Sequence, residues 1–408
     1  MRKLLFYTIL SGALLQVSSC KAKNTDQQNI NIESESLKDI EQTQNKKSII
    51  LGADKISQIT ELTKDKNVGL IINHTSYLSD NKTFLLDTLV ASGVKVKKLF
   101  SPEHGFRGES DAGETVKDGK DIKTGLPLIS LYGKNKKPSE EHLSDIDILI
   151  FDIQDVGVRF YTYISTMHYS MESAAKFGKE FIVLDRPNPN DLVEGPVLEN
   201  NCKSFVGTLP IPVLHGLTVG ELANMIKNEG WIEGDIKLNV VKTENWKHGD
   251  PFSLSIKPSP NLPNDVSIRL YPSLCLFEGT EVSIGRGTYM PFQVIGYPDS
   301  VFGDFMFTPK SLPGFDKNPL QKDKTCYGVD LRNDTTTKGF DLTYFIDFYN
   351  KSKDKSKFIS RKRFFDLLAG TEKLRHQIES GVTISEIESS WQPKLDKYKE
   401  TRKKYLLY

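Results

Sequence analysis

The sequence is poor in cysteine, has no excess of charge of either sign and contains no long apolar run. Its 54 Lys and Arg residues nearly balance 53 Asp and Glu residues, which leaves a formal net charge of +1. This balance gives no electrostatic reason to expect nucleic acid or an anionic membrane surface as a partner. Because no apolar stretch reaches the roughly 20 residues that a membrane-spanning helix needs, we predict no spanning helix.

Cysteine is too scarce to support a disulfide framework. Apart from Cys20, the chain has only Cys202, Cys275 and Cys326, and three thiols cannot all pair within one chain. No CxxC pair and no Cys/His spacing typical of zinc is present. We therefore predict mostly buried free thiols, with one disulfide and one leftover cysteine as the alternative.

Several catalytic and cofactor motifs are also missing. The chain has no GxGxxG turn after its first strand and no P-loop, so a nucleotide is not supported and we expect no cofactor. HExxH and GxSxG are absent too, which removes two common hydrolase sites. We predict no metal site; the alternative would be built from Glu103, His104, Asp152 and His168.

The first 20 residues have the pattern of an export signal, with Arg2 and Lys3 before an apolar stretch at residues 4–17. The stretch leads into Val-Ser-Ser-Cys, which resembles a lipobox in which Cys20 is lipidated. We predict an exported lipoprotein that is held at the membrane only by a lipid on Cys20; a plain secretory signal is the alternative. Because Lys21 rather than Asp follows, we expect the outer membrane, facing the periplasm or the surface.

The remainder divides into a tether and two domains. Residues 21–48 are polar and poor in aromatic side chains, so they cannot bury enough apolar surface to offset their ordering entropy, and we predict a flexible tether. A rise in Pro and Gly around residues 188–212 marks a change of domain. We predict a catalytic domain at residues 49–200 and a smaller domain at residues 201–408. The sequence does not indicate an oligomeric state.

Apolar runs alternate with helical patterns in the first domain. We predict strands at residues 68–73, 94–100, 146–152 and 181–185, and helices at residues 85–92 and 167–177. Strands that are buried on both faces read as continuous apolar runs, so the pattern favours an α/β fold with a Rossmann-like, mostly parallel sheet. For the second, smaller α+β domain, we predict strands at residues 238–241, 293–295 and 327–331, and helices at residues 217–226, 344–349, 361–368 and 391–405.

Each predicted strand of the sheet ends in a polar segment. Asn73 follows the first strand, Glu103 the second, Asp152 the third and Asp185 the fourth. Ligands of open α/β sheets bind outside the carboxyl ends of the strands, so we expect these segments to share one rim. Asn73 is predicted to bind the ligand. Asp185 either does so or caps a helix.

Residues 101–108, Ser-Pro-Glu-His-Gly-Phe-Arg-Gly, form the strongest local motif. Glu103 and His104 stand side by side just past a strand, and Gly105 would let the backbone approach a ligand closely. A partly desolvated carboxyl group has a raised pKa and can act as a general acid. We predict Glu103 as the catalytic acid and His104 and Gly105 as ligand contacts. Alternatively, Glu103 caps a helix or pairs with Arg107.

A second motif covers residues 152–163. Carboxylates and amides suit the hydroxyl groups of a sugar, aromatic faces suit its ring, and arginine suits a carboxylate. The predicted site residues of this motif are Asp152, Gln154, Asp155, Arg159 and Tyr161. An ion pair between Asp155 and Arg159 is the alternative for that pair. In a polar, glycine-rich insert of the second domain, Glu278 and Arg286 either reach the first domain or pair with each other.

Taken together, these motifs resemble the NamZ-type exo-β-N-acetylmuramidase family, formerly a domain of unknown function. The resemblance runs from about residue 51 to the C-terminus and is carried by residues 101–108, 152–163, 185–189, 194–196, 271–272, 278–280 and 285–288. It implies a Rossmann-like domain, a smaller C-terminal domain and a site in the cleft between them. It also implies an enzyme that removes N-acetylmuramic acid from the non-reducing end of peptidoglycan fragments, with Glu103 as acid/base.

On this hypothesis Glu103 protonates the glycosidic oxygen, and Asp152 or Glu278 activates water or stabilises the transition state. The substrate's own acetamido group is another candidate nucleophile. Arg159 or Arg286 would bind the lactyl carboxylate that distinguishes muramic acid from glucosamine. The competing hypotheses are a non-catalytic peptidoglycan-binding lipoprotein and a metal-dependent hydrolase.

Overall fold

The computed structural model describes residues 47–102, 106, 118–133 and 135–408. The predictions for Cys20, for the signal at residues 1–20 and for all but the end of the tether lie outside the described residues. So do the predictions for Glu103, His104 and Gly105. None of the helices in the described part of the chain is long and apolar enough to cross a membrane.

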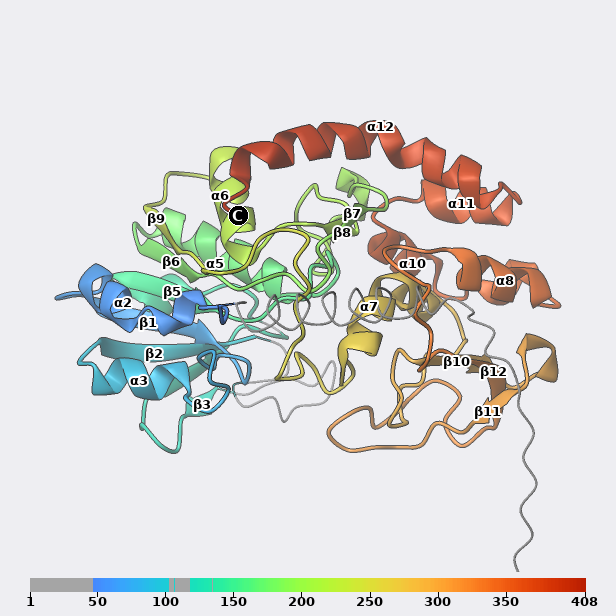
Figure 1. Cartoon of the computed structure of the whole chain (residues 1–408), viewed down its shortest axis with the longest axis horizontal. Coiled ribbons are helices and arrows are strands. Elements are labelled where there is room, and N and C mark those ends of the chain that lie inside the picture. The colour runs from blue at the N-terminus through green and yellow to red at the C-terminus, as the bar shows by residue number, and fades with distance from the viewer. Residues whose placement is uncertain (1–46, 103–105, 107–117, 134) are drawn as a thin grey trace, which may run out of the picture. The chain divides into compact units, whose positions relative to one another are not determined.

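A seven-stranded sheet forms the core of the first lobe (Figure 1). In spatial order its strands are β3 (Gly119–Lys120), β4 (Pro127–Ser130), β2 (Lys95–Ser101), β1 (Asn67–Ile72), β5 (Ile148–Asp152), β6 (Glu180–Leu184) and β9 (Leu238–Val241). All neighbours are parallel except β3 and β4. Without β3, numbering along the chain gives the order 3-2-1-4-5-6 of dinucleotide-binding folds, which confirms the Rossmann-like sheet.

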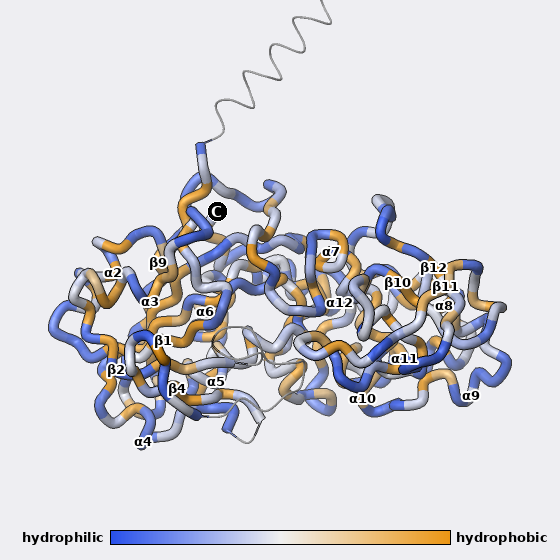
Figure 2. The backbone as a smooth tube through the Cα atoms, turned by 90° about the horizontal axis from the view of Figure 1, so that it is seen from below, coloured by the Kyte–Doolittle hydropathy of each residue, from blue (hydrophilic) through white to orange (hydrophobic). Residues whose placement is uncertain are grey.

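The strands are apolar along their length because both faces of the sheet are covered. On β5, Ile148 and Ile150 belong to one apolar core cluster, and Leu149 and Phe151 belong to another. Side chains of a strand alternate between its two faces, so burial on both sides leaves no polar position. The helices that contribute to the two clusters are α2 (Ile56–Leu62) and α3 (Leu85–Ala91) on one face, and α5 (Tyr163–Lys176) and α6 (Val219–Asn228) on the other. The apolar segments around β1 in Figure 2 belong to this sheet.

Helix α6 begins with the capping box that its sequence predicts. The Thr218 hydroxyl accepts a hydrogen bond from the backbone N–H of Glu221 (3.2 Å), and the Glu221 carboxylate accepts one from the N–H of Thr218 (2.9 Å). The next strand, β9, forms at the predicted residues but pairs with β6. The sheet therefore continues beyond residue 200, into the segment that the sequence assigns to the second domain.

The C-terminal part combines helices with a small antiparallel sheet, as predicted. Its sheet has the order β10 (Val294–Tyr297), β12 (Cys326–Asp330) and β11 (Phe305–Phe307). Its helices are α7 (Asp265–Leu274), α8 (Thr343–Lys351), α9 (Lys355–Phe358), α10 (Lys362–Ala369), α11 (Lys373–Glu379) and α12 (Ile384–Arg402). Helix α7 was not among the predicted helices, and Pro272 lies inside it.

Short elements complete the described part of the chain. They are α4 (Glu140–Leu143), the two-stranded sheet of β7 (Val193–Glu194) and β8 (Leu214–His215), and the 3-10 turns η1 (Gly52–Asp54), η2 (Asn200–Cys202), η3 (Cys275–Gly279), η4 (Ser300–Phe302) and η5 (Lys403–Tyr405). Cys202, Cys275 and Cys326 are buried free thiols, which confirms that prediction.

Helix α12 returns the chain to the first lobe (Figure 1). The hydroxyl of Tyr398 donates to the carbonyl of His215 (2.7 Å), and that of Tyr408 donates to the carboxylate of Asp185 (2.7 Å). The last residues of the chain are therefore hydrogen-bonded to the end of β6.

Candidate active site

The loops after β1 and β5 lie where the strand order of the sheet reverses, the usual ligand position in this fold. Asn73 is fully buried there, and its side-chain oxygen Oδ1 accepts from the N–H (2.8 Å) and the hydroxyl (2.6 Å) of Thr75. The Thr75 hydroxyl accepts from the N–H of Gln154 (3.0 Å), which joins the two loops. The Asn73 amide nitrogen has no acceptor among the described residues, so it can serve a ligand.

Asp152 does not have the surroundings of a catalytic base. It is 0% exposed, and its two oxygens accept from Nε (2.7 Å) and Nη2 (3.0 Å) of Arg186. Burial raises the pKa of Asp152, against the opposing effect of Arg186. This bidentate pair holds the ends of β5 and β6 together, an arrangement that does not favour the predicted role of Asp152 in activating water.

Arg159 is also a structural residue. It is 1% exposed and donates to the carbonyl oxygens of Pro196 (2.8 Å), Ile211 (3.0 Å) and Leu368 (2.8 Å). Burial lowers its pKa to about 9. Arg159 thus ties the loop after β5 to α10, and its partners are backbone carbonyl oxygens rather than Asp155, the alternative partner.

Asp185 caps a helix rather than facing a ligand. Its carboxylate accepts from the N–H of Gly220 (2.7 Å) in the first turn of α6, from the hydroxyl of Thr218 (2.7 Å) and from that of Tyr408 (2.7 Å). It is fully buried, and burial raises its pKa to about 6 although these hydrogen bonds oppose the shift. Of the two predicted alternatives, the capping role is the one observed.

Gln154 and Asp155 are both buried, but only Asp155 has a buried side-chain oxygen atom without a hydrogen-bond partner among the described residues. The Gln154 amide donates to the carbonyl oxygens of Asp155 and Pro187 (both 2.9 Å), so it fastens the loop. Asp155 Oδ2 accepts from the N–H of Gly157 (2.6 Å), while its Oδ1 has no donor among the described residues. Asp155 therefore keeps an unused acceptor, as a ligand-binding carboxylate would.

His215 faces Asp155 from β8. Its Nδ1 accepts from the N–H of Leu217 (3.2 Å), so a neutral ring carries its proton on Nε2. That nitrogen lies 3.6 Å from Asp155 Oδ2. Both side chains are buried, and His215 Nε2 has no hydrogen-bond partner among the described residues.

A cavity of about 400 Å³ is lined in part by residues 160–163, which follow β5, and not by Asn73, Asp155 or His215. It is lined from the first lobe by residues that follow β4 and β5 and from the C-terminal part by residues of α7, η3 and the loop before β10. Three predicted site residues, Tyr161, Glu278 and Arg286, meet there. The cavity is therefore built from both parts of the chain.

Glu278 and Arg286 form an ion pair in the wall of this cavity. Nε (3.1 Å) and Nη2 (2.5 Å) of Arg286 both donate to Oε1 of Glu278. Burial would lower the pKa of Arg286, but the adjacent carboxylate raises it overall. Only one carboxylate oxygen is used by the pair, and Nη1 of Arg286 donates to no described residue, so both side chains retain groups for a ligand.

Aromatic rings form much of the remaining wall. The Tyr161 ring lies 4.7 Å from that of Tyr163 and 6.0 Å from that of Tyr271, and both contacts are edge-to-face. Burial raises the pKa of Tyr161 and of Tyr271 well above the ordinary value, so these phenols stay neutral. Such walls with a few polar groups are typical of small-molecule sites.

Sequence reasoning did not select Tyr271, Phe292 or Asn261, which also line the cavity. Tyr271 lies in a segment that carries the family resemblance, so that segment was an available signal. Asn261 and Phe292 reach the cavity only through the folding of loops, and their own sequence surroundings gave no such signal.

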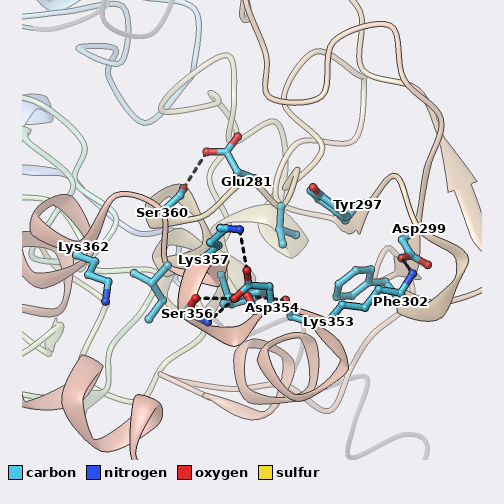
Figure 3. A pocket seen from close by; sticks show the side chains of 14 residues that line it. Glu281, Tyr297, Asp299, Phe302, Lys353, Asp354, Ser356, Lys357, Ser360 and Lys362 are labelled. Atoms are coloured by element: carbon cyan, nitrogen blue, oxygen red, sulfur yellow. Dashed lines mark hydrogen bonds and ion pairs between the residues drawn. The ribbon is translucent and has the colours of Figure 1, made fainter.

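A larger hollow of about 770 Å³ lies in the C-terminal part, and none of the predicted site residues line it (Figure 3). Its three lysines are each paired with a carboxylate: Lys353 with Asp299 (2.6 Å), Lys357 with Asp354 (2.9 Å) and Lys362 with Glu379 (2.8 Å). Since its lysines are already matched, size alone does not make it the better candidate.

The described residues contain no group of three or more His, Cys, Asp or Glu side chains that could hold a metal ion. Of the alternative metal set, Asp152 pairs with Arg186, and His168 lies 3.1 Å from the carbonyl oxygen of Trp231. Burial lowers the pKa of His168. Both residues have structural surroundings; Glu103 and His104 lie outside the described residues.

The mostly parallel sheet, the smaller C-terminal part and the aromatic cavity lined by both define an α/β protein with a smaller C-terminal domain. The chain belongs to the NamZ exo-β-N-acetylmuramidase family. The model of that family's N-terminal domain matches residues 68–266, and the model of its C-terminal domain matches residues 269–408. The cavity is lined by residues from both matched segments.

Relatives of known sequence and structure agree with this assignment. The chain is 39% identical over 391 residues to the peptidoglycan β-N-acetylmuramidase NamZ of Bacillus subtilis strain 168, covering 90% of this chain and 93% of that protein. Two crystal structures of DUF1343 family proteins from Bacteroides fragilis NCTC 9343 are similar. One is 44% identical with a TM-score of 0.81, covering 89% of this chain and 99% of that one; the other is 31% identical with a TM-score of 0.78, covering 88% and 99%.

Proposed function

We propose that this protein is an exo-acting β-N-acetylmuramidase, a glycoside hydrolase that releases terminal N-acetylmuramic acid from peptidoglycan fragments. The observation that carries the proposal is the cavity of about 400 Å³ with aromatic walls and the Glu278–Arg286 pair, in a chain of this family. Its volume lies near the lower end of the range for small-molecule sites, which suits one terminal sugar.

The cavity residues divide into those that hold the sugar and those that act on it. The rings of Tyr161 and Tyr271 offer apolar faces to the sugar ring. Arg286 can bind the lactyl carboxylate through Nη1, because its other two nitrogens, Nε and Nη2, already donate to Glu278. Arginine recognition of this carboxylate would separate muramic acid from glucosamine, which lacks it.

Two carboxyl groups are assigned to the chemistry. Glu103, two residues beyond the end of β2, remains our proposed acid that protonates the glycosidic oxygen. Since Asp152 is matched by Arg186, Glu278 is the remaining predicted carboxylate to activate water or stabilise the positive charge of the transition state. Asn73 and Asp155, each with an unused polar atom at the sheet edge, are proposed as substrate contacts.

The decisive experiment incubates the chain lacking residues 1–20 with the disaccharide of N-acetylmuramic acid and N-acetylglucosamine, and measures the sugars released by chromatography. We expect release of N-acetylmuramic acid from the native chain. The Glu103→Gln variant should lose turnover by about two or more orders of magnitude and still bind the disaccharide.

The competing functions give different results in the same assay. Binding of the disaccharide without release by the native chain would favour a peptidoglycan-binding protein. Loss of activity in a chelator, with recovery on adding a divalent metal, would favour a metal-dependent hydrolase. Full activity in the chelator agrees with the proposal.

We also propose that the protein is exported and held in the outer membrane by a lipid on Cys20. The support is the charged start, the apolar stretch and the lipobox-like residues before Cys20. Fractionation of cells should place the native chain with membranes and a Cys20→Ala variant in the soluble envelope fraction. Equal distribution of both would contradict the anchor.

A further inference from the structure

The cavity of about 400 Å³ suits the terminal sugar of a glycan fragment but not also the sugars that follow it. This argument rests on the proposed function, in which the terminal sugar is cut from a longer fragment. The sugars on the leaving side must therefore lie outside the cavity. In a fragment without peptides, each further muramic acid unit brings a negative charge there, because its lactyl carboxylate is free.

The cavity lining has a buried part and an accessible part. Phe160, Tyr161 and Tyr163 are buried, whereas Tyr132 and Phe205 are partly exposed. The rings of Tyr132 and Phe205 contact each other, with centroids 6.1 Å apart. These two rings therefore form a part of the lining that solvent can reach.

Side chains that do not line the cavity pack against Phe205. The ring of Tyr169, on α5, is partly exposed and lies 6.0 Å from the Phe205 ring, with the planes at 32°. The ammonium group of Lys136 lies 4.6 Å from the centroid of the Phe205 ring. That of Lys137 lies 4.6 Å from the centroid of the Tyr169 ring. Both contacts have the geometry of a cation–π interaction, so each ring carries a positive charge.

The two lysines differ in how their charges are used. Lys137 forms an ion pair with Glu172 of α5. Lys136 is partly exposed, and among the described residues its ammonium group has no carboxylate within ion-pair distance and no hydrogen-bond acceptor. Its contact with Phe205 orders a long side chain, so less rotamer entropy remains to be lost when an anion binds. Lys136 is therefore an ordered cation with free N–H donors beside the cavity lining.

We propose that Lys136 binds the lactyl carboxylate of the second muramic acid unit when a longer glycan fragment occupies the site. The N-acetylglucosamine unit between the two muramic acids is uncharged, so this carboxylate is the first anion beyond the cleaved bond. A surface lysine alone does not indicate a ligand. Lys136 differs because it lies on a ring of the cavity lining and has no described acidic partner. It would thus favour longer fragments over the disaccharide.

The test compares two peptide-free substrates, the disaccharide and the tetrasaccharide of alternating N-acetylmuramic acid and N-acetylglucosamine. Only the tetrasaccharide has a carboxylate beyond the terminal sugar. In Lys136→Met we expect kcat/KM for the tetrasaccharide to fall about threefold to tenfold, the range for one charged contact at a partly exposed position. The value for the disaccharide should stay within about twofold. Lys136→Arg keeps the charge and should keep both values.

Lys176→Met is the matched control. Lys176 is exposed, and its ammonium group lies 5.3 Å from the centroid of the Phe177 ring. At 1.5 Å per residue, it lies about 20 Å along α5 from Tyr163, which lines the cavity. The variant removes the same charge from the same kind of contact and should change neither value. Added salt should reduce the preference of the native chain for the tetrasaccharide, because salt screens exposed charges, but not that of Lys136→Met.

An unchanged kcat/KM for the tetrasaccharide in Lys136→Met would overturn the proposal. So would an equal fall for both substrates, because Lys136 would then act on the terminal sugar. If the native chain cleaves neither substrate, the proposed function fails, and the Kd of the tetrasaccharide, measured by calorimetry, becomes the measure. A Kd that is weaker in Lys136→Met but not in Lys136→Arg would then support the binding site, and equal values would overturn it.

Discussion

At the carboxyl edge of the sheet, the carboxylates of Asp152 and Asp185 are completely buried, whereas Glu278 and Arg286 in the cavity wall keep 22% and 23% of their side chains exposed. Each carboxylate oxygen of Asp152 and of Asp185 accepts at least one hydrogen bond from the protein. In the cavity, Arg286 uses only one oxygen of Glu278.

The difference separates structural from chemical use of the same residue types. A buried charge is tolerated only when the protein pairs it and satisfies its hydrogen bonds, so a fully matched carboxylate has nothing left for a ligand. A partly matched pair at a cavity wall keeps both charge and free donors or acceptors. Position at a strand end is therefore a weaker guide to function than the degree to which each polar atom is used.

Removing Arg186 should produce the largest effect on stability. Arg186→Met leaves the Asp152 carboxylate buried without its partner, and such changes cost about 3–5 kcal/mol of unfolding free energy. Urea denaturation measures this loss. The double variant Asp152→Asn with Arg186→Met should recover part of the stability, because the uncompensated charge is gone.

Lys351→Met is the matched control for that experiment. Lys351 and Asp347 form an ion pair one helical turn apart on α8, with 37% and 43% of their side chains exposed. Loss of an exposed pair of this kind costs about 0.5 kcal/mol or less. If Arg186→Met reduced the unfolding free energy no more than Lys351→Met, the claim that the buried Asp152–Arg186 pair stabilises the fold would be wrong.

Glu278→Gln should reduce activity about as strongly as Glu103→Gln. The variant keeps the shape of the side chain but removes the charge that faces Arg286 and the sugar. We expect kcat/KM for the disaccharide to fall at least about 100-fold, equivalent to about 2.7 kcal/mol. Glu281→Gln, an exposed carboxylate whose oxygen accepts from Ser360 (2.8 Å), should stay within about twofold. Similar kinetics for the two variants would remove Glu278 from the mechanism.

The fold could be predicted largely because its strands are buried on both faces. Such strands are apolar without interruption, and β1, β2, β5 and β6 were all found within two residues of the predicted ends. β9 was found as a strand but not assigned to the sheet, because pairing with β6 depends on a long-range contact that local pattern does not contain.

The site was harder to predict for a physical reason. The sequence shows that Asp152 and Asp185 follow strands, but not that Arg186 and Tyr408 take up their oxygens. Partners 34 and 223 residues apart in the chain decide the use of these carboxylates. Glu278 and Arg286 are only eight residues apart, so their pairing could be considered from the sequence alone.

The pH dependence of stability tests His248, another buried charge that the protein itself pairs. Burial would lower its pKa, but Asp191 (2.7 Å) and Glu221 (2.9 Å) accept from its two nitrogens and raise the pKa to about 9. The ordinary value is about 6.5, so the stabilisation is complete below pH 6.5 and is lost as the pH rises through 9. Between pH 7 and pH 9 the unfolding free energy should fall by about 2 kcal/mol. Urea denaturation at pH 7 and pH 9 should show this fall in the native chain but not in His248→Gln. An equal fall in both chains would show that the pH dependence does not come from His248.

The smallest expected effect concerns Tyr408, and it depends on the charge of Asp185. Tyr408→Phe removes a donor to Asp185 and an acceptor for the N–H of Thr243 (2.9 Å), which should cost about 1 kcal/mol at pH 7.5. Burial has raised the pKa of Asp185 to about 6, above its value of about 3.9 in an unfolded chain, so stability falls as the pH rises from about 4 to 6 and the folded carboxyl group ionises. Losing the hydroxyl donor disfavours the ionised form further, and the cost of Tyr408→Phe should therefore shrink when the pH falls from 7.5 to 5. A cost that is equal at both pH values would show that the hydroxyl acts through Thr243 and not through the carboxylate.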